Sequence, residues 1–241
     1  SSPAGAISYN ENYGNIIVTP SALGAGMNAG GIVGAWFAGA TIVSHCGNYG
    51  DVTNSGTASR GTGGIVGGLM SPGAGGTIEY CYNGGNITDT GSGSVGGISG
   101  GGSHAISHCG STGGLSGTAA VGAVAANGAK SVDNCYWFGS GITGTTVAFA
   151  GGVTATNSYY GSKDDSVTLS DVSEENRLTA KDFASGAAAY LLDGGKNPHS
   201  NIWSFGGGIP IFGNAAGGIG GSYYMVTLQP SSNGTLAFGD G

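Results

Sequence analysis

Gly63-Gly64-Ile65-Val66-Gly67 is the stretch that decides the fold, because it recurs along the chain. The same five residues stand at 30–34, and degenerate versions stand at 96–100, 121–125 and 151–155. Each of the first four copies is followed by a second unit that carries one cysteine. These cysteines are Cys46, Cys81, Cys109 and Cys135. Two short units that alternate in this way are typical of a repeat protein, in which one repeat is one structural unit.

Each repeat offers two or three short strands rich in Ile and Val, with too little apolar surface to fold alone. If each repeat is one coil of an all-β solenoid, like strands lie about 4.8 Å apart in parallel sheets, and like side chains form files along the interior. One file contains either Ile32 or Val33 with its equivalents, because only one of two adjacent residues points inward in a regular strand. The other two files are Ile42, Ile78, Ile106 and Val132, and Ile16, Val52, Ile87, Leu115 and Ile142. Flanking glycines allow close approach of the coils and supply positive φ at the corners.

Composition excludes several classes of protein. The chain has 241 residues, and 54 of them are glycine, which excludes a mainly helical fold. Only 8% of the residues are charged, too few to keep a chain expanded and disordered in water. The net charge is −7 with six Lys and Arg, so we expect no nucleic-acid partner. No run of about 20 apolar residues occurs, so we expect no membrane insertion of this segment. A start without Met and a strand pattern at the end indicate a piece of a longer protein.

Gly-Gly-Ile-Val-Gly followed by Ile-x-x-Cys-x-Asn-x-Gly-x-Ile/Val is similar to the GLUG repeat of bacterial cell-surface proteins. The resemblance covers residues 7–160 and is most specific in the first coils. It implies a right-handed parallel β-helix, here of about five or six coils, on an exported bacterial protein. It implies no activity, because the repeat accompanies many different neighbours. The zinc motif His-Glu-x-x-His, found in the IgA-cleaving metallopeptidases that contain this repeat, does not occur in the chain.

We expect four segments along the chain. They are a β-helix at 1–169, a capping segment at 170–213, a glycine-rich linker at 214–222, and a β-hairpin or the start of a further domain at 223–241. The capping segment contains one α-helix with Thr179 as N-cap, Asp182 completing a capping box, and Leu178 packing on Phe183. Its apolar face is Phe183, Ala187, Tyr190 and Leu191, and it ends at Gly194-Gly195. Trp203 and its apolar neighbours complete a cap over unpaired backbone groups at the open end of the solenoid.

The four cysteines share one position with Asn10 and Ser158. This small-residue position favours four buried free thiols, although the strand spacing also permits disulfides between Cys46 and Cys81 and between Cys109 and Cys135. The structural set of residues is completed by Gly31, Gly64, Gly97 and Trp203. We expect no metal or cofactor, because His45 and His108 lie two coils apart with Tyr80 between them.

Acidic residues do not converge in the sequence pattern. Asp51, Asp89 and Asp133 occupy different positions in their repeats, so we expect no catalytic residues. A second acidic group is Asp164, Asp165, Glu174 and Glu175, which reads as a solvated loop or an adventitious calcium site.

Aromatic residues give the best indication of binding. Exposed rings along a rigid solenoid can stack on sugars or anchor a protein, and the candidates are Tyr49, Tyr82, Tyr136, Trp137 and Tyr159. The simpler interpretation is that these rings cover the coils beneath them.

These observations predict a non-catalytic spacer or adhesion module of an exported bacterial protein. It would act outside the cell as a monomer, attached to the surface through other parts of its parent chain. Its partner would be a host or bacterial surface protein or a glycan. The first alternative is a glycan-binding module that uses Tyr82, Tyr136 and Trp137, and the second is a polysaccharide hydrolase or lyase built on a β-helix.

Overall fold

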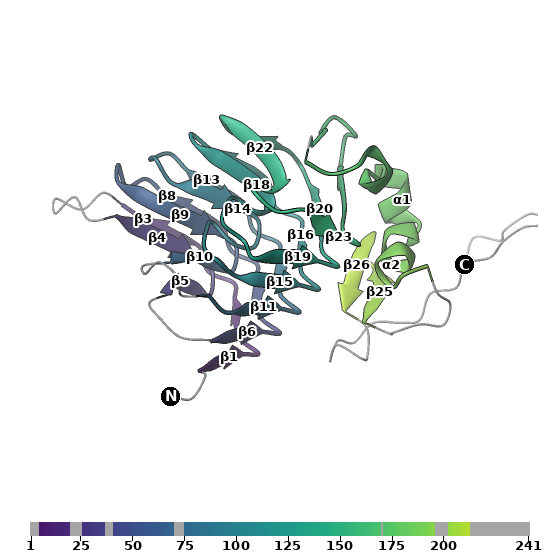
Figure 1. The fold of residues 1–241 in the computed structure, drawn as a ribbon, viewed down its shortest axis with the longest axis horizontal. Coiled ribbons are helices and arrows are strands. Elements are labelled where there is room, and N and C mark those ends of the chain that lie inside the picture. Colours follow the sequence, from purple (N-terminus) through teal and green to yellow (C-terminus); the bar gives the residue numbers. More distant parts are fainter. Residues whose placement is uncertain are drawn as a thin grey trace, which may run out of the picture.

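The computed structural model describes residues 5–19, 26–36, 41–69, 75–169, 171–195 and 202–212. Its strands stack side by side in parallel sheets (Figure 1), which confirms the predicted parallel β-helix. Two sheets have six strands and two have five, so the described residues form five coils and the first strands of a sixth.

The four sheets are named A to D in the order in which each coil passes through them. Sheet A contains β1 (Ala6–Ser8), β6 (Ile42–Ser44), β11 (Thr77–Glu79), β15 (Ala105–Ser107), β19 (Ser131–Asp133) and β23 (Ala155–Thr156). Sheet B contains β2 (Glu11–Asn12), β7 (Gly47–Asn48), β12 (Tyr82–Asn83), β16 (Gly110–Ser111), β20 (Tyr136–Gly139) and β24 (Tyr159–Ser162). Sheet C contains β3 (Ile16–Val18), β8 (Val52–Asn54), β13 (Ile87–Asp89), β17 (Leu115–Gly117) and β21 (Ile142–Thr143). Sheet D contains β4 (Met27–Gly30), β9 (Ser59–Gly63), β14 (Ser94–Gly96), β18 (Ala120–Ala125) and β22 (Thr146–Ala150), and a short sheet beside it contains β5 (Val33–Trp36) and β10 (Val66–Leu69).

The interior files follow the strand register. The file in sheet C is Ile16, Val52, Ile87, Leu115 and Ile142, as predicted. The file in sheet A is Ile7, Val43, Ile78, Ile106, Val132 and Ala155. The prediction that Ile42 belongs to this file is wrong, because Val43 pairs with Ile78 and Ile42 faces outward with 39% of its surface exposed. Adjacent apolar residues made either register compatible with the pattern.

The Gly-Gly-Ile-Val-Gly unit is a corner and not a straight strand. Ile65 and Val66 are both fully buried, so the prediction that only one of each such pair points inward is wrong. The backbone N–H groups of both residues donate to the carbonyl of Ile98, each at 3.0 Å. Because two consecutive N–H groups share one acceptor, the chain bends here and both side chains enter the core.

A second corner joins sheet A to sheet B in every coil. It is formed by one residue in the left-handed region, with φ between 42° and 58°. These residues are Tyr9, His45, Tyr80, His108, Asn134 and Asn157. Glycine was expected to supply positive φ at the corners, but aromatic residues, histidine and asparagine do so at this one.

The last coil is covered by the segment that follows β24. Val167, Leu169 and Val172 pack on the interior core, and the carboxylate of Asp171 accepts hydrogen bonds from Phe149 N at 2.6 Å and Ala150 N at 3.0 Å. Asp171 thus takes the place of carbonyl groups that a further coil would present to β22.

Two short helices and a hairpin lie together on one flank of the later coils (Figure 1). They are α1 (Ala180–Ala184), α2 (Ala187–Leu192), β25 (Trp203–Gly206) and β26 (Ile209–Phe212), preceded by the 3-10 turn Glu174–Asn176. The capping box between Thr179 and Asp182 is confirmed. Gly186 adopts a φ of 83° and divides the predicted single helix in two. None of the described helices is long and apolar enough to cross a membrane.

The break at Gly186 shifts the buried face of the helical segment. Phe183 is buried as predicted, but its buried partners are Ala188, Ala189 and Leu192 in place of Ala187, Tyr190 and Leu191. These residues and Trp203 form a second core with Tyr136 and Phe138 of β20. The helices and hairpin therefore cover the outside of sheet B, while residues 163–169 and 171–178 cover the end of the solenoid. The predicted linker at 214–222 and hairpin at 223–241 lie outside the described residues.

Candidate binding groove

Rings stack along the corner between sheets A and B. The ring centroids are 4.8 Å apart for Tyr9 and His45, 4.9 Å for His45 and Tyr80, and 5.0 Å for Tyr80 and His108. The spacing repeats because each ring stands on the same corner residue of its coil. Since the faces cover one another, this ladder presents mainly ring edges to solvent.

A second ladder of tyrosines lies beside the first, and its stacking is interrupted. Tyr13 and Tyr49 stack at 4.8 Å with an interplanar angle of 10°, but Tyr49 and Tyr82 are 5.8 Å apart and inclined by 48°. A Cβ at Gly47 would lie 2.9 Å from the Tyr49 ring, so this glycine leaves the space into which that ring leans. Because inclined rings cannot cover each other fully, part of a ring face stays open between Tyr49 and Tyr82.

The hairpin of β25 and β26 forms a wall opposite these rings. Trp203 Nε1 donates to Asn134 Oδ1 at 2.7 Å, and Tyr136 Oη donates to the carbonyl of Pro210 at 2.8 Å. Phe212 stacks on Trp203 at 5.0 Å and meets Tyr80 edge to face at 6.3 Å. Two hydrogen bonds and these ring contacts fix the wall to the solenoid.

Between the hairpin and the two ladders lies a groove of about 540 Å³. This volume falls within the range of about 300–1,000 Å³ that is typical of small-molecule sites. Its lining is Tyr9, Glu11, His45, Cys46, Gly47, Tyr49, Tyr80, Tyr82, Tyr136, Trp203, Ile209, Pro210, Ile211 and Phe212. Among the described residues, the solenoid side of this lining comes from the first three coils and, through Tyr136, from the fifth, and the lining includes no Lys or Arg.

The polar groups of the groove are oriented by their neighbours. Tyr13 Oη donates to the carboxylate of Glu11 at 2.8 Å, and the hydroxyl groups of Tyr82 and Thr112 are 2.6 Å apart. Burial raises the pKa of Tyr49, Tyr80 and Tyr82 above the ordinary phenol value. These three phenols therefore stay protonated at physiological pH and can both donate and accept hydrogen bonds.

The predicted aromatic candidates separate in the structure. Tyr49 is 44% exposed and lines the groove with the half-buried Tyr82. Tyr136 and Trp137 are fully buried, so the prediction that they are exposed for ligand stacking is wrong. The hairpin covers Tyr136, and Trp137 points into the core, where its Nε1 donates to Gly113 O at 3.2 Å. Tyr159 is half-buried against the second core and does not line the groove.

The cysteines lie on adjacent coils, as the repeat alignment predicts. All four are buried free thiols. Cys81 and Cys109 each direct Sγ at the carbonyl two residues earlier, at 3.2 Å. Burial raises the pKa of the Cys109 thiol well above its ordinary value. This file of buried side chains fills the core.

A ladder of buried amides is the feature that the sequence analysis missed. Asn12 Nδ2 donates to Asn48 Oδ1 at 2.7 Å, and Asn48 Nδ2 donates to Asn83 Oδ1 at 2.8 Å. The signal was the spacing Asn-x-Gly, since each asparagine also donates to the carbonyl of the glycine two residues later. Gly31 and Gly64 pack against this file, and a Cβ at Gly64 would lie 2.4 Å from Asn83 Cγ. Gly97 packs against Ser111, whose hydroxyl accepts from Asn83 Nδ2 at 3.3 Å.

The predicted acidic residues form hydrogen bonds that hold the fold together. Asp51 Oδ1 accepts the N–H of Asn86 at 2.8 Å, and the buried Asp89 accepts the hydroxyl groups of Ser59 at 2.8 Å and Thr62 at 2.7 Å. Asp133 accepts from Thr156 Oγ1 at 2.6 Å. In the predicted acidic loop, Asp164 bonds Ser166, the backbone N–H of Ala180 donates to Asp165, and Glu174 pairs with Arg177 at 3.4 Å. Among the described residues, no group of three or more His, Cys, Asp or Glu side chains is placed to hold a metal ion.

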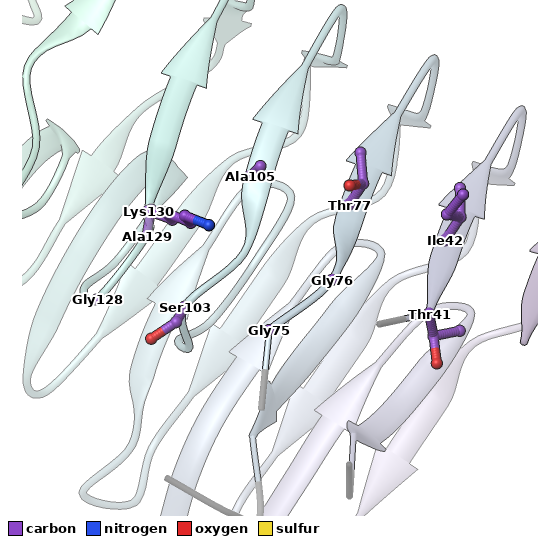
Figure 2. Close-up of a pocket in the computed structure, with 10 residues that line it drawn as sticks. All are labelled: Thr41, Ile42, Gly75, Gly76, Thr77, Ser103, Ala105, Gly128, Ala129 and Lys130. Atoms are coloured by element: carbon purple, nitrogen blue, oxygen red, sulfur yellow. The ribbon is translucent and has the colours of Figure 1, made fainter. Parts of the chain in front are cut away.

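A second hollow, of about 690 Å³, lies where the chain enters sheet A. Figure 2 shows its lining, to which successive coils contribute short side chains such as Ile42, Thr77 and Ala105. Among the described residues that line it, Lys130 is the only ionisable one. The groove beside the hairpin is smaller, but its lining contains tyrosine rings, phenol hydroxyl groups and a carboxylate.

Comparison with known proteins found no matching family model, no matching curated protein and no matching solved structure.

Proposed function

We propose that the chain is a non-catalytic spacer and adhesion module of an exported bacterial surface protein. The observation that supports this proposal most directly is the repetition of the same bonds from coil to coil. The thiol file, the amide ladder and the strand register each connect a coil to the next in one direction. Such a stack resists bending and repeats its outer surface once per coil.

The use of the carboxylates supports the absence of catalysis in this proposal. Asp51, Asp89 and Asp133 each accept hydrogen bonds from the neighbouring coil or from within the core. Acid and base groups of a glycosidase must instead face a shared substrate across about 5–9.5 Å. Carboxylates engaged in holding coils together are poorly placed for that reaction.

Stiffness can be measured with spin labels on Ile17→Cys and Thr143→Cys. These positions lie in one outward column of sheet C, in the first and fifth coils. The two labelled backbone sites are four strand spacings apart, so we expect a single narrow distance distribution that corresponds to a separation of about 19 Å. The four native thiols are buried and should not react with the label. A broad distance distribution would contradict a stiff module, and release of sugar fragments from polysaccharides by the pure chain would contradict a non-catalytic one.

A further inference from the structure

We propose that the groove between β26 and the two ring ladders binds a neutral, extended oligosaccharide. The proposal rests on the adhesive role proposed above and names the chemical class of the ligand. It uses Tyr49 and Tyr82 on one side and the hairpin on the other, while Tyr136 and Trp137 remain buried.

The groove combines apolar surface with hydroxyl groups. Ile209 and Ile211 of β26 face ring edges and phenol hydroxyl groups across the groove. A pyranose ring has the complementary surface, with C–H groups on its faces and hydroxyl groups around its edge. A purely apolar ligand would displace water from the phenol hydroxyl groups and the Glu11 carboxylate without replacing the hydrogen bonds of that water, which costs free energy.

The interrupted stacking of the tyrosines also favours a sugar ligand. A fully stacked ladder offers only ring edges, whereas the 48° inclination between Tyr49 and Tyr82 leaves part of a ring face open at the groove. The C–H face of a sugar can pack there, as apolar groups do on aromatic faces. The coils repeat every ~4.8 Å, a distance similar to one sugar unit in an extended chain, so successive units can meet equivalent positions.

The charge of the groove favours a neutral ligand. The described residues that line the groove include Glu11 and no Lys or Arg, and the whole chain has a net charge of −7. Anionic polysaccharides, phosphorylated ligands and nucleic acids would meet repulsion without a compensating cation. A neutral ligand meets no such penalty, and Glu11 can accept hydrogen bonds from its hydroxyl groups.

The backbone edge of β26 favours a sugar over an added peptide strand. An added peptide strand needs free backbone N–H and C=O groups at the edge of β26. Pro210, in the middle of this strand, has no N–H, and its carbonyl already accepts the hydroxyl of Tyr136. The edge is therefore interrupted where a peptide would have to pair.

The test is calorimetric titration of the full chain with hexasaccharides. Cellohexaose, xylohexaose and the N-acetylated chitin hexamer are the neutral probes, and hexagalacturonate is the anionic one. We expect at least one neutral probe to bind and hexagalacturonate not to bind. Tyr49→Phe removes one hydroxyl and should weaken binding about fivefold, the effect of one ordinary hydrogen bond. Tyr49→Ala also removes the ring and should weaken binding more than tenfold.

Tyr159→Phe is the matched control, because it removes a phenol hydroxyl on the outer column of sheet B, outside the groove. Its affinity should equal that of the parent. Three results would overturn the inference: no binding of any neutral probe at millimolar concentration, unchanged binding in Tyr49→Ala, or preference for hexagalacturonate. A narrow spin-label distance without sugar binding would remove the inference and leave the spacer, whereas a broad distance with binding would remove the spacer alone.

Discussion

At the scale of single residues, buried asparagines connect the coils. Asn48 donates to Gly50 O and to Asn83 Oδ1 while its own oxygen accepts from Asn12. A buried amide with its groups paired costs little, whereas an unpaired one costs about 1–3 kcal/mol. A shift of one coil by a single residue would break every such pair, so the ladder selects the register that the apolar files also favour.

The left-handed corner changes its residue type along the solenoid. In the first four coils this corner is occupied by Tyr9, His45, Tyr80 and His108. The left-handed conformation costs about 1–2 kcal/mol per residue, and the stacking of neighbouring rings offsets part of this cost by contributing about 0.5–1.5 kcal/mol per pair. Asn134 and Asn157 then follow at the same corner. Asparagine tolerates this conformation, and both residues bond to the flanking elements, Asn134 to Trp203 and Asn157 to the carbonyl of Leu192. The ring ladder therefore stops where the helices and the hairpin bond to this corner.

Acid should destabilise the fold through His104. This residue is fully buried, and burial lowers its pKa to about 4 from an unfolded value near 6.5, although a backbone hydrogen bond at Gly101 opposes the shift. Between these values the unfolded chain binds a proton that the folded chain does not, so stability falls as pH falls. We expect a loss of about 2 kcal/mol between pH 7 and pH 5, measured by urea unfolding.

His104→Gln tests the assignment, because glutamine does not titrate. The variant should be less stable than the parent at pH 7 but should lose less stability on going to pH 5. Equal losses in the two proteins would show that other groups cause the acid sensitivity.

At the scale of elements, the strands at the ends of each sheet differ from the inner strands in how their backbone groups are paired. Inner strands pair on both sides, whereas β22 has a neighbouring strand on one side only among the described residues. The carboxylate of Asp171 supplies acceptors for two of its N–H groups, which would otherwise form an exposed edge. A side chain here does what a further strand does elsewhere.

Asp171→Ala should therefore loosen the edge of β22. Loss of two charge-assisted hydrogen bonds is expected to lower the free energy of unfolding by about 1–3 kcal/mol, with water replacing part of the loss. Amide hydrogen exchange of Phe149 and Ala150 should accelerate more than that of Val121 in the adjacent inner strand. Asp164→Ala is the control, because its side chain bonds the nearby Ser166 and Ser162 and not β22. Unchanged exchange at Phe149 and Ala150 would mean that Asp171 does not protect this edge.

Sequence reasoning recovered the elements that local patterns determine. The repeat spacing predicted the parallel coils, the file in sheet C and the stacking of the cysteines, and the capping box predicted the start of α1. It assigned Ile42 to the core, because alternation cannot distinguish two adjacent apolar residues. It also treated Tyr136 and Trp137 as exposed. No local pattern could show that Tyr136 is buried, because the hairpin that covers it, and whose Pro210 accepts its hydroxyl, lies 74 residues away.

Only part of the lining of the groove could likewise be predicted from the sequence. Tyr49 and Tyr82 were recognised as ring positions, but their tilt depends on Gly47, and the opposing wall comes from a hairpin near the end of the described chain. A site formed between a repeat array and a distant segment has no spacing rule. Three-dimensional contacts were needed to find it.

At the scale of the whole molecule, each coil contacts chiefly the coils before and after it, so stability should be close to a sum of coil and interface contributions. Removing one coil should then shorten the solenoid without unfolding it. Deletion of residues 77–104 joins Gly76 to Ala105 and stacks the second coil on the fourth. Val43 would then lie next to Ile106, Cys46 next to Cys109 and Val52 next to Leu115, which keeps every file apolar or small.

We expect this variant to retain its strand signal in circular dichroism and a cooperative thermal transition, at a lower midpoint. Solution scattering should show a particle shorter by one strand spacing, about 4.8 Å. Deletion of residues 77–90 is the matched control, because it removes half a coil and aligns strands of sheet D with strands of sheet A. That variant should not regain a cooperative transition, since its inward and outward residues no longer coincide between coils. If both deletions unfold the chain equally, the coils do not stack as interchangeable neighbours, and the solenoid must instead depend on contacts specific to its third coil, such as the edge contact between Tyr80 and Phe212.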